Sequence, residues 1–290
     1  MTVILGNVVR TLAILAVTIH CFANAGNPWN YGAGPDGHVH WGLVDPSYVT
    51  CDKGMQQSPI DINDDTLGSF VTATVAPLVY DYSPIYDAVA HWNGHAVEVD
   101  WVPNDASHNS SITIRGKQYN LIQFHFHTPS EHRIYGKHAA AELHMVHRSP
   151  EDGALAVVAV LLHARRHNMP FFHFLTELDG KVVRTQGKTT TTTTSQLRST
   201  NATSVDVKLK PVNLTPLIRA IGNFGPRWEY SGSLTTPPCS ENVAWSVMQR
   251  SFPIGLQQLR AAVDLEGFNA RETNVISRFK PTNTKRTIIV

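Results

Sequence analysis

Short stretches rich in Val and Ile fill the middle of the chain. The segment HAVEVDW (95–101) alternates apolar and polar residues, and it is followed at short spacing by SITIRG, QYNLIQFHFH and AAAELHMVH. Runs of this length, bounded by Gly, Pro, Asn and Ser, indicate β-strands. The next run, ALAVVAVLLHA (154–164), begins with nine apolar residues and no alternation, which is typical of a strand buried on both faces.

Helical patterns are sparse by comparison. The segments NMPFFHFLTEL (168–178) and GLQQLRAAVDL (255–265) each predict one helix. With 290 residues, 42% of them hydrophobic and 16% charged, the chain is long and apolar enough for a substantial core. We therefore expect a mostly β, α+β protein in which one large sheet carries a few short peripheral helices.

One segment departs from this pattern. Residues 185–204, TQGKTTTTTTSQLRSTNATS, contain six consecutive threonines and almost no apolar side chains. Such a segment buries too little surface to offset the entropy lost on ordering it, which predicts a long flexible surface loop. The alternative is a linker between two domains. The strand-like sequence on both sides, and a C-terminal part too short for its own core, favour a loop within one domain.

The N-terminal segment resembles a secretory signal. Arg10 precedes the apolar run TLAILAV, and Ala23-Asn24-Ala25 forms a small-x-small cleavage pattern. We expect residues 1–25 to be removed, leaving 26–290 without a transmembrane segment and secreted from the cell. The alternative is an N-terminal membrane anchor, although the apolar run is short for a bilayer.

Removal of this signal also removes Cys21 and leaves two cysteines, Cys51 and Cys239. An even number in an oxidising compartment indicates one disulfide, and two unpaired buried thiols are the alternative. Three Asn-x-Ser/Thr sequons, at Asn109, Asn201 and Asn213, are candidate glycosylation sites, of which the first two lie in polar stretches. The formal net charge of +1 lacks the basic excess of a nucleic-acid-binding protein.

The stretch QFHFH carries the first sign of chemistry. Strand side chains alternate faces, so His125 and His127 lie on one face and His144 follows on the next strand of similar character. Three neutral imidazoles suit Zn²⁺ with a fourth position left for water, and ordinary sheet histidines are the alternative. Metal-bound histidines need a partner for the second N–H group, and Gln123 and Glu142 are spaced for that role.

These stretches resemble a known family. QFHFHTPSEH, AELHMVH and YSGSLTTPPCSE are similar to motifs of the alpha-class carbonic anhydrases, and GNPWNYG, QQSPIDI and NGHAVEV match in the same order. The resemblance extends from about Trp29 to the C-terminus. It implies one domain (26–290) around a large, mostly antiparallel twisted sheet. It also implies a zinc enzyme that interconverts CO₂ and bicarbonate, with zinc hydroxide as nucleophile; the oligomeric state stays open.

The resemblance also implies roles for individual residues. His125, His127 and His144 match the zinc ligands, and Gln123 and Glu142 match their hydrogen-bond partners. Thr235 and Glu131 match the hydroxyl and carboxylate that orient the nucleophile, and His95 matches the proton shuttle. The polar residues of the proton path are Tyr31 and Asn93. The residues that match the CO₂ pocket are Val146, Val157, Leu234, Thr236, Val243 and Trp245. Cys51 and Cys239 match the disulfide of secreted members.

Two features differ from the family pattern. The run Asn-x-Arg-Pro-x-Gln-Pro expected near the end is matched only in parts by NVISRFKPTNTKR (274–286), and the threonine-rich stretch is unusually long. Two other functions on the same fold stay open, a non-catalytic binding protein and a zinc hydrolase of esters. The presence of all three histidines with Glu131 and Thr235 argues against the first, and a narrow apolar pocket argues against the second.

Overall fold

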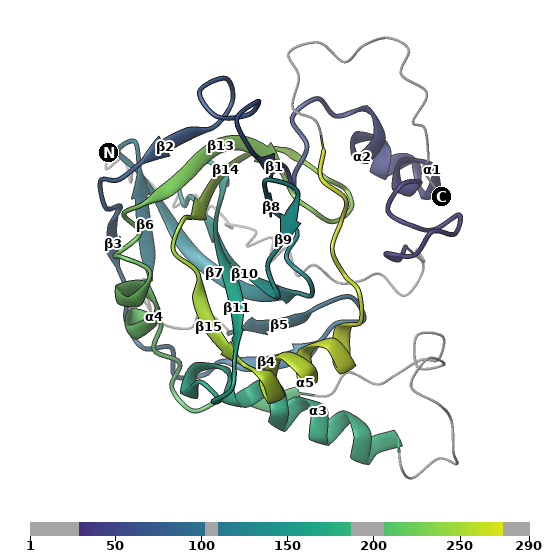
Figure 1. The fold of residues 1–290 in the computed structure, drawn as a ribbon, viewed down its shortest axis with the longest axis vertical. Helices are drawn as coiled ribbons and strands as arrows, with labels where there is room; N and C mark the ends of the chain where they lie inside the picture. The colour runs from purple at the N-terminus through teal and green to yellow at the C-terminus, as the bar shows by residue number, and fades with distance from the viewer. Residues whose placement is uncertain (1–28, 102–109, 187–205, 275–290) are drawn as a thin grey trace, which may run out of the picture.

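One twelve-stranded sheet organises the computed structural model, which describes residues 29–101, 110–186 and 206–274 (Figure 1). In spatial order, its continuous path consists of β12 (Asp206–Lys208), β4 (Val89–Trp92), β5 (Val97–Asp100), β7 (Lys117–His127), β10 (Ala141–Arg148), β11 (Leu155–Arg165), β14 (Glu241–Met248), β13 (Arg227–Ser233) and β2 (Thr72–Thr74). The predicted strands of the central segment are all present, and β11 is buried over most of its length, as its apolar sequence predicts.

Further strands extend this sheet and form a second one. β15 (Phe252–Gly255) pairs with β11, while β6 (Ser111–Ile114) pairs with β7 and with β3 (Val79–Asp81). The small sheet contains β1 (Asp61–Ile62), β8 (Arg133–Ile134) and β9 (Lys137–His138). Most neighbours are antiparallel; β11 is parallel to β14 and β15, and β1 is parallel to β8. The expected fold class, a large and mostly antiparallel sheet, is confirmed.

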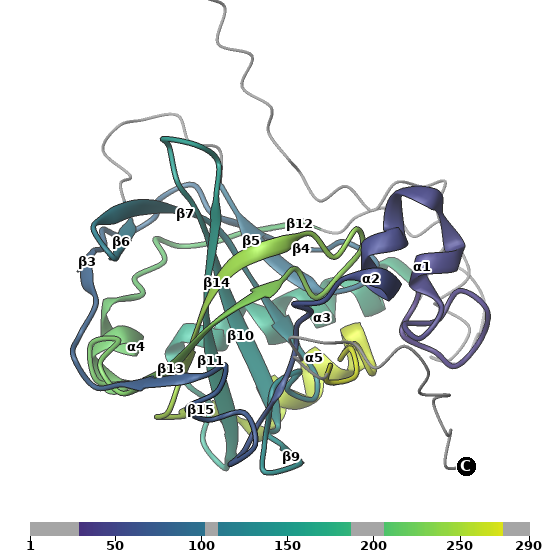
Figure 2. The ribbon, with the colours of Figure 1, turned by 90° about the horizontal axis from the view of Figure 1, so that it is seen from above.

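Short helices lie around the sheet. The two predicted helices are α3 (His173–Gln186), preceded by the 3₁₀ turn η2 (Pro170–Phe172), and α5 (Leu256–Glu266). These two pack against each other, and Figures 1 and 2 show them side by side. The remaining helical elements are α1 (Trp41–Val44), η1 (Pro46–Tyr48), α2 (Val49–Lys53) and α4 (Thr215–Ala220). Within the described ranges, none of the helices has the length and apolar character needed to cross a membrane.

The main core holds β7 and β10 in place. Phe124 and Phe126 are fully buried on the face of β7 opposite to the histidines, and Phe126 packs on Phe172 and Phe174 with centroids 5.7 and 5.9 Å apart. Leu143 and Met145 extend this core across β10. Close packing on this face fixes the strands that carry the imidazoles on the other.

Several predictions lie outside the described residues. These are the signal segment 1–25, the threonine-rich loop beyond residue 186, and the sequons at Asn109 and Asn201. The first two residues of the expected loop, 185 and 186, belong to the last turn of α3. The third sequon is described: Asn213 is exposed, and its side-chain oxygen accepts a hydrogen bond from the Thr215 N–H at 3.0 Å.

Candidate metal centre and catalytic site

Three imidazoles converge on one face of β7 and β10. Antiparallel pairing places His144 directly opposite His125, and His127 lies two residues further along the same face. The ring centroids are 5.0 Å apart for His125 and His127, 5.1 Å for His125 and His144, and 4.7 Å for His127 and His144. One nitrogen of each ring lies within 4.8 Å of the other two. The structure thus brings together the three histidines singled out in the sequence.

Each imidazole uses its other nitrogen in a hydrogen bond to an oxygen atom. The pairs are His125 Nδ1 with Gln123 Oε1 at 2.9 Å, His127 Nδ1 with the Asn269 carbonyl at 2.8 Å, and His144 Nε2 with Glu142 Oε1 at 2.8 Å. These oxygens are acceptors, so the bonded ring nitrogen is the N–H donor. The lone pairs of the neutral rings therefore lie on Nε2, Nε2 and Nδ1, which are the nitrogens left for a metal.

Electrostatics keep these rings in the form that binds a metal. Burial lowers the pKa of each of His125, His127 and His144, that of His127 to about 4, so all three are neutral at pH 7. Among the described residues, the buried His127 Nε2 has no hydrogen-bond partner. A buried lone pair without a partner is costly, and a cation at this point would satisfy it. The donor set fits Zn²⁺.

Glu131 lies beside this cluster and is fully buried. Its Oε1 accepts a hydrogen bond from the Arg271 N–H at 2.9 Å, and Oε2 lies 3.4 Å from His127 Nε2. Burial raises the pKa of this carboxyl to about 7, against the smaller lowering effects of His144, the nearby Thr235 hydroxyl and the Arg271 N–H. Thr235 and Glu131 are thus neighbours, as the sequence motif implied.

The expected shuttle, His95, stacks on an aromatic ring that the sequence did not single out. Its ring lies parallel to that of Trp29, with centroids 3.7 Å and planes 9° apart. The His95 backbone N–H donates to Asn93 Oδ1 at 3.0 Å, and the Tyr31 ring makes an edge contact with the Trp29 ring, with centroids 5.5 Å apart. Burial lowers the pKa of His95 to about 4 in this position.

An apolar wall flanks His144. Val146 lies opposite Val157 on β11, and Val157 lies opposite Trp245 on β14. The Trp245 ring packs edge-on against His144 with centroids 5.0 Å apart. Val243 and Leu234 belong to the same small apolar cluster. Thr236, from the expected pocket set, lies half-buried in the loop after β13, where its carbonyl accepts from the Cys239 N–H at 2.9 Å.

A buried polar network behind Glu142 was missed in the sequence. Glu142 Oε2 accepts from the N–H groups of Glu131 and His132, both at 2.8 Å, and Oε1 contacts His132 Nδ1 at 2.6 Å. The network continues from His132 Nε2 to the Tyr230 hydroxyl at 2.7 Å and on to Ser58 Oγ at 2.8 Å. Burial raises the pKa of Glu142, but His132 and His144 outweigh this effect and hold it well below its usual range. The one sign of this network in the sequence was that His132 directly follows Glu131.

The C-terminal residues that contact the site lie nearer the N-terminus than the stretch compared with the family pattern. Asn269 and Arg271 contact His127 and Glu131, so the Asn-x-Arg pair that touches the site is Asn269-Ala270-Arg271. The stretch compared with the family pattern begins five residues later, at Asn274, and residues beyond 274 lie outside the described part. Glu272 then stands where the family pattern has Pro, and Asn274 stands where it has Gln.

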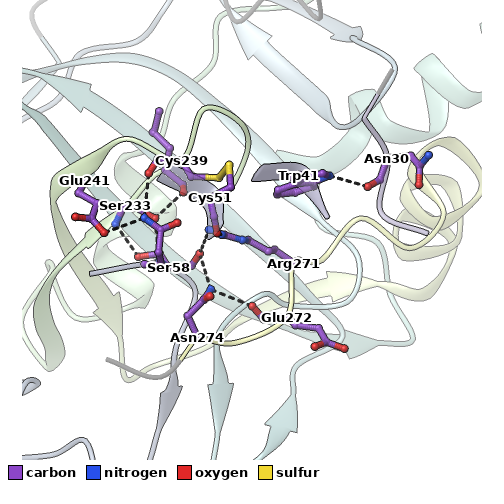
Figure 3. The surroundings of a disulfide bond; sticks show 12 residues. Asn30, Trp41, Cys51, Ser58, Ser233, Cys239, Glu241, Arg271, Glu272 and Asn274 are labelled. Atoms are coloured by element: carbon purple, nitrogen blue, oxygen red, sulfur yellow. Dashed lines mark hydrogen bonds between the residues drawn. A yellow bond between two sulfur atoms is a disulfide. The ribbon is translucent and has the colours of Figure 1, made fainter. Parts of the chain in front are cut away.

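A disulfide connects this region to α2 (Figure 3). Cys51 and Cys239 are bonded, as predicted, with an S–S distance of 2.06 Å. The Arg271 guanidinium donates to the Cys51 carbonyl at 2.9 Å and to the Ser58 carbonyl at 2.7 Å. The loop that carries Thr235 is therefore tied to α2 through sulfur, and Arg271 is tied to the same helix.

Comparisons with known proteins identify the family of this chain. The family model for eukaryotic-type carbonic anhydrase matches residues 36–288. A carbonic anhydrase of Klebsiella pneumoniae is 34% identical over 250 residues, covering 85% of this chain and 87% of that protein. Dioscorin dioA3 of Dioscorea japonica is 30% identical over 275 residues, covering 93% and 89%. The Photobacterium profundum alpha-carbonic anhydrase structure has a TM-score of 0.64 at 30% identity, covering 87% of this chain and 98% of that one.

The chain thus carries three clustered histidines on the central strands of one large sheet. With the family match over most of its length, the chain belongs to the eukaryotic-type, alpha-class carbonic anhydrase family. Its enzyme class is accordingly that of a carbonic anhydrase, whose substrates are CO₂ and bicarbonate.

Proposed function

We propose that this chain catalyses the reversible hydration of CO₂ with a zinc ion held by His125, His127 and His144. The observation that carries the proposal is the convergence of three buried, neutral imidazoles, each with one nitrogen already hydrogen-bonded to an oxygen. When bound, zinc supplies activation of water to a hydroxide nucleophile near neutral pH, a role for which carbonic anhydrases are the reference case. Gln123, Glu142 and the Asn269 carbonyl fix the tautomers of the ligands.

The chain's own residues orient the reaction. With its Oε1 held by the Arg271 N–H, Glu131 keeps its buried Oε2, which has no hydrogen-bond partner among the described residues, available to accept from the nearby Thr235 hydroxyl. A hydroxyl that donates to a carboxylate can only accept from the nucleophile, so a lone pair of the attacking oxygen is directed toward the substrate. Val146, Val157, Val243, Leu234 and Trp245 supply the apolar wall that receives CO₂.

Proton export is assigned to His95, with Asn93 and Tyr31 along its path. In the stacked position beside Trp29, the pKa of about 4 leaves this imidazole almost unprotonated at pH 7. A ring that leaves the stack regains hydration, and its pKa moves toward 6.5, where it exchanges protons efficiently with buffer. His95 thus works as a shuttle by moving between the stack and water.

Secretion and glycosylation belong to the same proposal. The Cys51–Cys239 disulfide suits an oxidising compartment, and the exposed Asn213 is accessible to a glycan, with Asn109 and Asn201 as further candidates. N-terminal sequencing of protein secreted by a eukaryotic host is expected to begin at residue 26. Retention of residues 1–25 in the secreted form, or retention of the chain at the membrane, contradicts this part.

Metal removal tests the catalytic proposal. Treatment with a zinc chelator is expected to abolish CO₂ hydration, and one equivalent of Zn²⁺ is expected to restore it. Hydration that survives complete metal removal contradicts the proposal. Efficient turnover of a bulky ester with feeble CO₂ hydration would instead favour a zinc hydrolase.

A further inference from the structure

A second group of metal-ligating side chains lies outside the histidine site. His91 on β4 and Glu98 and Asp100 on β5 place one ligand atom each within 4.8 Å of the others. His91 Nδ1 and Asp100 Oδ1 are 3.9 Å apart. A third such group, His132 with Glu142 and His144, differs because its members are joined by short hydrogen bonds.

Strand register places this group next to the catalytic cluster. His91 pairs with Glu98 across β4 and β5, and Glu98 pairs with His125 across β5 and β7. His125 in turn pairs with His144 across β7 and β10. These four residues form one cross-strand row on the same face of the sheet, and Asp100 lies two residues from Glu98 on that face. The second group is thus separated from His125 by one strand spacing.

The charge of this group is not balanced by basic side chains. In the described part of the chain, neither Glu98 nor Asp100 has an ion pair with Lys or Arg, and Asp100 faces the imidazole of His91 at 3.9 Å. Glu98 is 9% exposed, and its Oε2 makes two long hydrogen bonds, to Asn93 Nδ2 at 3.5 Å and Gln123 Nε2 at 3.4 Å. Burial, and then the charge of Asp100, raise the pKa of Glu98 to about 7. A cation held between Glu98 and Asp100 would favour the charged form of both carboxylates.

The group is also open to solvent on one side. The side chains of His91 and Asp100 are 20% and 31% exposed, whereas Glu98 forms the buried end. An ion can therefore reach the ligand atoms without local unfolding. The two partly exposed side chains have room to adjust their rotamers around it.

We propose that His91, Glu98 and Asp100 form a second divalent metal site, which takes Zn²⁺ through one imidazole nitrogen and two carboxylate oxygens. This mixed donor set is typical of zinc, and bonds of about 2.0–2.2 Å place tetrahedral ligand atoms about 3.4 Å apart. The ligand atoms, which lie no more than 4.8 Å apart, therefore need to approach one another by up to about 1.4 Å, within the reach of side-chain rotation. Water completes the coordination on the exposed side.

Binding at this site has a consequence for the reaction. The Glu98 carboxylate links Asn93, on the expected proton path, with Gln123, which holds His125. A metal that draws Glu98 toward His91 and Asp100 removes both hydrogen bonds, so excess zinc is expected to slow CO₂ hydration. This effect on rate rests on the proposed function, whereas metal binding at the second site does not.

Calorimetric titration of the zinc-loaded enzyme with additional Zn²⁺ tests the proposal. A second equivalent is expected to bind wild-type protein. Asp100→Asn and His91→Ala are expected to weaken it by at least about 10-fold, since loss of a ligand costs no less than loss of an outer-shell partner. His163→Ala, which removes an exposed histidine bonded to Ser251, is the matched control and should retain the second equivalent.

Two results overturn this site. One is wild-type enzyme that binds a single zinc, and the other is a second equivalent unchanged in both variants. Should a variant not fold, NMR of the wild-type imidazole nitrogens decides the question, because the second equivalent must shift the His91 signals. Unshifted His91 signals at full second-site occupancy contradict the proposal. The zinc that the enzyme already holds before the titration reports on the catalytic site separately.

Discussion

Arg271 and Glu131 are joined by a backbone N–H to carboxylate hydrogen bond of 2.9 Å, across 140 residues of sequence. The arginine is itself held from the other side, because its guanidinium donates to the carbonyls of Cys51 and Ser58 and lies 5.6 Å from the Trp41 ring. The side chain thus fixes the position of the backbone group that orients the catalytic carboxylate.

Arg271→Ala is expected to lower both stability and activity. Loss of a hydrogen bond from a buried charged group costs about 1.5–3 kcal/mol, so loss of the two guanidinium bonds should lower the free energy of unfolding by about 3–6 kcal/mol. Since Glu131 loses a fixed donor, kcat/KM should fall too, and Arg271→Lys should recover part of it. Denaturant unfolding and CO₂ hydration measure the two effects. Full activity in a folded Arg271→Ala enzyme would show that the backbone group stays in place unaided.

The stack of His95 on Trp29 leads to a second prediction. In Trp29→Ala the imidazole is more hydrated, so its pKa should rise from about 4 toward 6.5, as NMR titration can measure. His95→Ala should lower kcat by about 10- to 100-fold in weak buffer, with recovery on adding imidazole and little change in kcat/KM. An unchanged kcat in His95→Ala would remove this residue from the proton path.

His147 gives the protein an acid-sensitive component of stability. It is fully buried beside the Tyr82 hydroxyl at 2.5 Å, and burial lowers its pKa from 6.5 to about 3. Because the folded-state pKa lies below the unfolded value, the unfolded chain takes up the proton first as pH falls. The contribution of His147 to the free energy of unfolding is therefore fully present above pH 6.5. It is lost progressively between pH 6.5 and about 3, by up to about 1.4 kcal/mol per pH unit.

Variants isolate this component. His147→Gln removes the titrating group, so unfolding free energy should depend less steeply on pH between 6.5 and 3 than in wild type. The exposed His163→Gln serves as the control and should keep the wild-type slope. Equal slopes in all three proteins would mean that His147 is accessible to protons in the folded state.

Loss of the disulfide should affect both stability and the catalytic loop. Cys51 and Cys239 are 188 residues apart in sequence, so their bond constrains a large part of the unfolded chain. The double variant Cys51→Ser with Cys239→Ser should lose about 2–5 kcal/mol of unfolding free energy. Because the bond to Cys51 also ties the loop that carries Thr235 to α2, kcat/KM should fall even below the melting temperature. An unchanged melting temperature after verified loss of the disulfide contradicts a structural role for this bond.

The strands and the histidine pair follow from local patterns in the sequence. The alternation in QFHFH places His125 with His127 and sends Phe124 and Phe126 to the core, as observed. Convergence with His144 depends on β7 and β10 being neighbours, which the sequence pattern left as a condition and the structure shows. The roles of Thr235, Glu131 and His95 came from the resemblance and not from spacing.

Contacts between distant segments could not be read from local pattern. Trp29 reaches His95, and Asn269 and Arg271 reach β7 and Glu131, only after the chain has folded. Tyr230 and Ser58 join the Glu142 network through single hydroxyl groups, which leave no periodic signal. Similarly, the row from His91 to His144 exists only through the register of four strands.

Stopped-flow CO₂ hydration, with zinc content from the same preparation, tests the central claim most directly. Wild-type protein and His163→Ala are expected to hold one catalytic zinc per chain and to hydrate CO₂ rapidly. In folded His144→Ala, both the zinc and the activity above the buffer rate should be lost. Rapid hydration by zinc-free His144→Ala, or wild-type protein that folds correctly and binds no zinc, would contradict the three-histidine zinc site.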